Sequence, residues 1–126
     1  MLKEVIISIV IVLSITVLDF VTQDYTKATV KQTSVMLNNL KEEIKRDEEK
    51  ASDNLEEIFK NWEEKREKMA YFIEHDELEK VETNLTNIKS YIEQGEFDMA
   101  ISSIDEAEFI LKHIKEKNAF NLENIF

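Results

Sequence analysis

The sequence contains no cysteine, no proline and a single glycine among its 126 residues. The lack of cysteine excludes disulfides, thiolate zinc sites, cysteine nucleophiles and lipid attachment to an N-terminal cysteine. Basic residues are also scarce, since 16 Lys and Arg face 27 Asp and Glu, for a net charge of −11. Phosphate binding needs clustered basic side chains, so this charge argues against a nucleic-acid partner. It also disfavours docking of the acidic part of the chain onto anionic lipid.

An apolar run opens the chain. Residues 5–18 read VIISIVIVLSITVL without a charge, and Phe20 and Val21 extend the run past Asp19. As a helix, residues 5–21 span about 25 Å, near the lower limit for crossing a bilayer. The following DFVTQDYTKATV has no small-x-small cleavage site. We therefore expect an uncleaved transmembrane signal-anchor at residues 1–22, ahead of a cleaved signal peptide and of a buried globular helix.

Polar residues inside the apolar run are compatible with a spanning helix. The hydroxyls of Ser8, Ser14 and Thr16 can bond back to the preceding helical turn. The orientation is less determined, because the positive charges on the two sides of the run nearly balance. Lys3 and the α-amino group precede the run, and Lys27 and Lys31 follow it. The short N-terminal tail favours a single-pass protein of the cell membrane with its C-terminal domain outside.

Four later segments carry apolar residues at helical spacing, in stripes wide enough for a packed bundle. The first has Val30, Leu37, Leu40 and Ile44, with Thr33 in the remaining slot; the second has Leu55, Ile58, Phe59, Trp62, Met69, Phe72 and Ile73; the third has Leu78, Val81, Leu85, Ile88 and Ile92; the fourth has Ala100, Ile104, Ala107, Leu111 and Ile114, flanked by Phe97 and Ile101. Short connections between such helices make neighbours antiparallel. The pattern predicts an all-α protein, an N-terminal transmembrane helix followed by an antiparallel up-down four-helix bundle over residues 23–117.

Capping residues predict where the helices begin and end. Ser52, Asp53 and Asn54 suit the start of the second helix, with Asp47 as an alternative cap. Asn118 and Asn121 are expected to end the fourth helix.

The third helix has signals at both ends. His75 and Asp76 suit its start, with Glu79 as the capping-box partner of Asp76. Gly95 stands where the helix needs a left-handed residue after its last turn. Counting the alternations places the turn at His75 and the C-terminal tail, residues 118–126, at the membrane-proximal end.

The order of several short segments resembles a bacterial family known as domain of unknown function 4363. These segments are NWEEKREK at residues 61–68, HDELEKVE at 75–82, SYIEQGEFDMAI at 90–101, LKHIKEK at 111–117 and LENIF at 122–126, after the N-terminal anchor. The resemblance implies a single-pass helical membrane protein that often accompanies a multi-spanning membrane protein. It implies no activity.

Both histidines, His75 and His113, are expected near the membrane-proximal end. Four acidic residues crowd the same region: Glu74, Asp76, Glu77 and Glu116. One interpretation is a metal site, such as Zn²⁺, or a pH-responsive contact. The alternative, which we favour because no metal-ligand spacing is present, is that both histidines support helix ends.

Two features of the second helix have alternative interpretations. Trp62, with Phe59 and Tyr91 nearby, either lines a ligand cleft or packs in the core, and core packing is the usual role of aromatic residues at this spacing. Lys65 and Arg66 break the stripe of the second helix. We expect one of them to reach a carboxylate or to extend into solvent; binding of an anionic ligand is the alternative.

Apolar side chains also gather at the C-terminus. Phe120, Leu122, Ile125 and Phe126 lie within the last seven residues. They are expected to close the open end of the bundle, or else to contact the membrane or a transmembrane partner.

No nucleophile-base pair, phosphate-binding loop or cofactor motif is visible, so we expect neither an enzyme nor a bound cofactor. The leading interpretation is an accessory subunit that interacts with a multi-spanning membrane protein; homo-oligomers are also compatible. The alternative is an extracytoplasmic sensor or a ligand- or metal-binding bundle, which would need dimerisation or a partner because the chain has one hydrophobic segment.

Overall fold

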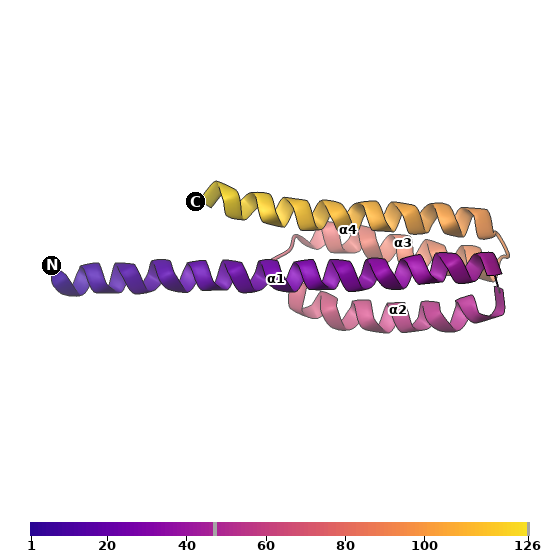
Figure 1. Cartoon of the computed structure of the whole chain (residues 1–126), viewed down its shortest axis with the longest axis horizontal. Helices are drawn as coiled ribbons and strands as arrows, with labels where there is room; N and C mark the ends of the chain where they lie inside the picture. Colours follow the sequence, from indigo (N-terminus) through magenta and orange to yellow (C-terminus); the bar gives the residue numbers. More distant parts are fainter. Residues whose placement is uncertain (47, 126) are drawn as a thin grey trace.

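The described residues form four helices and contain no strand (Figure 1). The computed structural model describes the backbone of residues 1–46 and 48–125, and the side chains of residues 1–46 and 51–119. In chain order the helices are α1 (Leu2–Arg46), α2 (Glu48–Met69), α3 (His75–Glu93) and α4 (Phe97–Ile125). The predicted all-α architecture, with a long apolar helix followed by a bundle, is confirmed.

Helix α1 is one uninterrupted helix of 45 residues. At 1.5 Å per residue it is about 67 Å long, more than twice the thickness of a bilayer's hydrocarbon core. Its first third projects beyond the other helices, while its remainder forms one side of the bundle (Figure 1). The apolar run and the bundle are therefore joined without a linker.

The four helices form a ring in which sequence neighbours are also neighbours in space. Helix α1 packs against α2 and α4, and α3 packs against α4 and, less closely, against α2. Helix α4 runs antiparallel to α1 and extends past the connection between α2 and α3 (Figure 1). The C-terminal end of the described chain thus lies on the same side as the apolar run.

The core is made of the predicted stripes. Leu37, Leu85 and Ile104 are fully buried, as are most of the other predicted stripe residues. Two features of the core were not expected from the sequence. Thr26 and Thr29 extend the buried face of α1 toward the apolar run. Ala51 is also fully buried.

The predicted start of the second helix is wrong. Helix α2 begins at Glu48, so Ser52, Asp53 and Asn54 lie inside it, and the amide of Asn54 donates to the Glu43 carboxylate of α1. Because the sequence around Ala51 continues the core stripe, packing overrides the local capping signal. The alternative cap, Asp47, lies outside the described residues.

The second helix also ends earlier than the stripe suggests. Helix α2 stops at Met69, and Phe72 and Ile73 belong to the connection to α3. Their backbone N–H groups donate to the Met69 carbonyl, a tight turn that still directs both side chains onto the core.

The start of α3 differs from the prediction, and its end agrees with it. The residue before α3 is Glu74, which makes no side-chain capping hydrogen bond, so His75 and Asp76 are the first helical residues and not its caps. Gly95 has a φ of +73°, as predicted. The N–H of Gly95 donates to the Ile92 carbonyl and that of Glu96 to the Tyr91 carbonyl, the paired bonds of a Schellman motif.

The fourth helix does not end at Asn118 or Asn121 but continues through Ile125. Among the described residues only Gly95 has a positive φ, so Asn118 does not adopt a helix-ending conformation. Its side chain instead donates a hydrogen bond to Thr26 Oγ1 of α1, at 3.2 Å.

Candidate functional site

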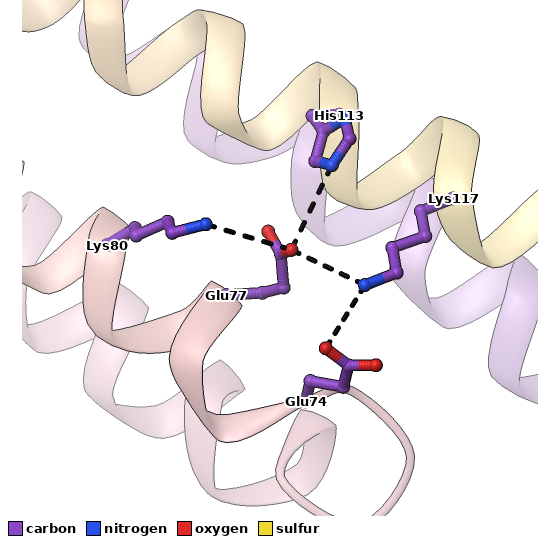
Figure 2. Close-up of polar contacts among 5 residues, drawn as sticks. All are labelled: Glu74, Glu77, Lys80, His113 and Lys117. Atoms are coloured by element: carbon purple, nitrogen blue, oxygen red, sulfur yellow. Dashed lines mark hydrogen bonds and ion pairs between the residues drawn. The ribbon is translucent and has the colours of Figure 1, made fainter.

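The end of the bundle nearest the apolar run holds a buried carboxylate, that of Glu77 on α3. Its side chain is 9% exposed, and its Oε1 lies 3.5 Å from Lys117 Nζ, 3.9 Å from His113 Nε2 and 4.0 Å from Lys80 Nζ. Figure 2 shows His113 and Lys117 reaching this oxygen from α4, and Lys80 from the next turn of α3. We call these four residues, with Glu74, the Glu77 cluster.

Glu74 completes the cluster from the connection before α3. Its Oε2 accepts a hydrogen bond from Lys117 Nζ at 3.1 Å, so one lysine of α4 bridges two carboxylates (Figure 2). The bond to Glu74 is the main cause of the raised pKa of Lys117; the nearby charges of Glu74 and Glu77 add to it and desolvation opposes it. Lys117 is therefore a stable cation at neutral pH, and the stability linked to its raised pKa is lost in alkali, as pH rises through that pKa.

The second oxygen of Glu77 has a different environment. Oε2 is buried and accepts no hydrogen bond from any residue that the structure describes. Beside the cluster lies a cavity of about 40 Å³, lined by Phe72, Ile73, Glu74, Glu77, Ile114, Lys117 and Asn118. A space of this size admits a water-sized molecule and is far below the volume of a metabolite pocket.

The two predicted metal candidates contact different carboxylates. His75 Nε2 lies 3.0 Å from Glu79 Oε1 on its own helix, while His113 contacts Glu77. Both imidazoles are more than half exposed. Within residues 1–46 and 51–119, no three His, Asp or Glu side chains are grouped so as to hold a metal ion.

Hydrogen bonds hold α1 and α4 together directly after the apolar run. Gln23 Nε2 donates to the Asn118 carbonyl at 3.3 Å, and the Asn118 amide donates to Thr26. Nearby, the Tyr25 ring packs edge-on against Phe72, with 6.3 Å between ring centroids, and Lys65 Nζ lies 5.8 Å from the Tyr25 centroid. Polar and aromatic contacts thus connect α1 to α2, to the connection between α2 and α3, and to α4.

Trp62 and Arg66 both have structural roles. Trp62 is 2% exposed and belongs to the core, which confirms core packing over a ligand cleft. Arg66 forms an ion pair with Glu82 of α3, which confirms that one of the two cations reaches a carboxylate.

For most of the predicted tail, residues 118–126, the structure describes the backbone but not the side chains. The side chains of Phe120, Leu122 and Ile125, and the whole of Phe126, lie outside the described residues. Whether they close the bundle or contact a membrane stays a prediction. The backbone of α4 shows that residues 120–125 continue a helix and are not an irregular tail.

The apolar run of α1 is uncovered. Its large apolar side chains between Val5 and Val21 are 47–69% exposed. An 18-residue window of this helix has a mean hydropathy of 2.6 and no buried residue, so α1 is long and apolar enough to cross a membrane. Ser8, Ser14 and Thr16 donate to carbonyls four residues back, at 2.8–2.9 Å, as expected.

Several residues of this end were not singled out from the sequence. Lys117, Gln23 and Thr26 were missed, although His113 and Lys117 are four apart and therefore share a face of α4. This spacing is the sequence signal from which Lys117 could have been identified.

Comparison with known proteins is informative for the family alone. No curated protein and no solved structure matches the chain. The model of the family described as domain of unknown function DUF4363 matches residues 20–125, which comprise the whole bundle and the end of α4 but little of the apolar run. The match covers most of the chain and confirms the resemblance found in the sequence, so this protein belongs to the DUF4363 family.

Proposed function

We propose that this protein is a single-pass, membrane-anchored and non-enzymatic accessory subunit that binds another membrane protein. The observation that carries the proposal is the uncovered apolar run, which continues as one rigid helix into the bundle. Thirteen large apolar side chains exposed along one helix are unfavourable in water and favourable in lipid or against a transmembrane partner.

The continuity of α1 supports a positioning role. A flexible linker would let the bundle move freely, whereas an unbroken helix holds it at a set height and rotation above the membrane. The hydrogen bonds of Gln23 and Thr26 with Asn118 stiffen this junction further. A subunit built this way presents defined surfaces to a neighbour.

The register of α4 supports a contact surface at the membrane boundary. Its antiparallel contacts with α1 pair Asn118 with Gln23 and Thr26, and Asp105 with Lys41. Continuing at 1.5 Å per residue, the backbone of Ile125 is level with roughly residues 16–19 of α1. The last turn of α4 would then enter the interface beside the apolar run, with the bundle outside the cell.

A non-enzymatic role is supported by how the polar groups are used. The charged side chains of the Glu77 cluster are engaged in ion pairs with one another, and the adjoining cavity is about 40 Å³. Catalytic groups instead converge on a concavity large enough for a substrate.

The anchor is tested by alkaline extraction of membranes and by single-cysteine labelling, for which a cysteine-free chain is well suited. We expect the protein to resist extraction. A cysteine at exposed Ser102 should react with a membrane-impermeant maleimide on intact cells, whereas one at Ser8 should not. Release at alkaline pH would contradict the anchor, and labelling of Ser102 only after lysis would reverse the orientation.

The partner is tested by truncation. Deleting residues 122–126 should weaken co-purification of a membrane protein while the melting temperature of the bundle changes little. A collapse of melting with no loss of a partner would make this segment only structural.

A sensor remains the second candidate because His113 contacts the buried Glu77 carboxylate across two helices. An imidazole gains charge within the physiological pH range, and the groups facing this contact are Glu74, Lys80 and Lys117. If the bundle senses pH or Zn²⁺, the His113→Ala variant should lose a pH-dependent change in melting, or calorimetry should detect zinc. Identical pH profiles and silent calorimetry would end this candidate.

A further inference from the structure

A groove lies between α2 and α3 in the membrane-distal half of the bundle, where these two helices pack less closely than other neighbours. Its volume is about 500 Å³. Its apolar lining consists of Leu55, Phe59 and Ile92, of which Phe59 and Ile92 are half-buried. The groove is thus large enough to accept one or two side chains of another molecule.

The rim of this groove is acidic. Glu56 on α2 and Glu93 on α3 are exposed on its two sides, and neither forms an ion pair with a described residue. The acidic rim continues along the outer face of α2 through Asp53, Glu57 and Glu63, with Lys60 the one cation among the residues lining that face. Apolar surface and an excess of negative charge therefore lie side by side, with Lys89 the one cation among the residues that line the groove.

A cation of the chain itself also lines the groove. The ammonium group of Lys89 on α3 lies 6.0 Å from the ring centroid of Phe59 on α2. An aromatic face at this distance attracts a cation, and the surrounding carboxylates strengthen that preference.

We propose that this groove binds a segment of a partner protein that presents an apolar side chain flanked by Lys or Arg. The inference rests on the proposed function, because it supplies the soluble contact of the same accessory subunit. The apolar side chain would cover Leu55, Phe59 and Ile92, while the basic residues pair with Glu56 and Glu93. Such rim charges contribute mainly partner selection and association rate.

Other occupants fit less well. The groove is level with α1 residues near Glu43 and Met36, whose contacts to Asn54 and Asn61 set the register of α2. It therefore lies roughly 25–35 Å beyond the apolar run, several Debye lengths from a lipid surface. A second copy of this chain would bring another net charge of −11 to an acidic rim.

The test is site-specific photocrosslinking of the full chain in its native membranes. A photoreactive phenylalanine analogue replaces Ser52, an exposed residue that lines the groove. The matched control places it at Ser102, exposed on α4, and a third probe at Val12 reports contacts of the anchor. Mass spectrometry of the adducts identifies the crosslinked peptide.

We expect the Ser52 probe to crosslink a peptide that carries Lys or Arg within one helical turn of an apolar residue. Reversing the rim with Glu56→Lys and Glu93→Lys should reduce this adduct about tenfold, since two attractions become repulsions. The control Glu106→Lys changes an exposed carboxylate on α4 and should leave the adduct unchanged.

Three results would overturn the inference: no adduct at Ser52 above that at Ser102, an adduct with lipid or a second copy, or an adduct equally insensitive to both charge changes. A protein adduct at Val12 without one at Ser52 would leave the proposed function standing and reject the groove. Absence of protein adducts at both positions would reject the two together.

Discussion

The two ends of the bundle are built differently. At the end nearest the apolar run, polar side chains connect the helices: Lys117 bridges Glu74 and Glu77, and Asn118 links α4 to α1. At the distal end, polar contacts join α1 to its neighbours through Lys41–Asp105 and Glu43–Asn54, but α2 and α3 leave a groove between them.

This difference indicates that the two ends of the bundle have different roles. Directional polar contacts specify one arrangement of helices, which suits the end from which the apolar run projects. Loose apolar packing with an acidic rim leaves surface for another molecule at the end furthest from that run. If this is so, the two ends should differ in energy as they differ in structure.

The largest effect is expected from core truncation at the proximal end. Leu78 is fully buried, so Leu78→Ala should leave a cavity and lower the free energy of unfolding by about 3 kcal/mol. Leu55→Ala should cost about 1–2 kcal/mol, because water entering the groove can fill the space. Chemical denaturation measures both, and equal losses would show that the groove side is packed as tightly as the core.

Removing the buried carboxylate should have the next largest effect. Glu77→Ala leaves Lys80, Lys117 and His113 without their shared carboxylate and should cost about 1–3 kcal/mol, less than a fully buried pair because these groups can turn toward water. The control Glu106→Ala should change stability by less than about 0.5 kcal/mol. A loss at Glu77 no larger than the control's would mean that the Glu77 cluster does not stabilise this end.

At the distal end, Gly95→Ala should cost about 1 kcal/mol. The φ of +73° is strained for a residue with a Cβ, although the added methyl would meet Phe97 at an ordinary 4.0 Å. Gly95→Asn should cost less, since asparagine tolerates this conformation. Thermal melts that rank Asn below Ala would contradict the conformational explanation.

The smallest effect concerns pH and Glu108 on α4. Burial, followed by the charge of Asp105, raises the pKa of Glu108, against the opposing charge of Lys41. A raised carboxyl pKa means that this group favours folding at acidic pH and that its contribution is lost as pH rises through the folded pKa. Glu108→Gln should therefore stabilise the bundle at pH 7, by less than about 0.5 kcal/mol after solvent screening, and have no effect near pH 3.

A gain from Glu108→Gln that is the same at both pH values would show that the side chain's shape and not its charge is responsible. Melting curves of the variant and the parent at pH 3, 5 and 7 separate these outcomes.

Much of the fold could be predicted because it depends on local patterns. The spacing of Leu78, Val81, Leu85 and Ile88 is compatible with a single buried face, and all four are fully buried. Gly95 was predictable because no other residue in the chain adopts a left-handed turn so cheaply.

The errors arise where a local signal competes with packing. Ser52, Asp53 and Asn54 favour a helix start, but burial of Ala51 and the bond from Asn54 to Glu43 extend α2 to Glu48. Asn118 suits a helix end, yet its bond to Thr26 lets α4 continue.

The Glu77 cluster could be predicted only in outline. The sequence brings His113 and Glu77 to one end of the bundle, but which cation reaches the carboxylate depends on the axial offset and rotation of α3 against α4. A rotation of one residue is 100° and would replace Lys117 with a neighbour. The pairing is therefore a property of the packed helices and not of the spacing alone.

The most direct test of the central claim replaces residues 2–21 with an unrelated transmembrane helix of equal length, keeping the rest of α1 in register. If the apolar run is part of the interface, the exchanged protein should stay in the membrane and melt normally but lose its membrane partner on co-purification. Retention of the partner at full yield would show that the run is only a tether, which would contradict the account.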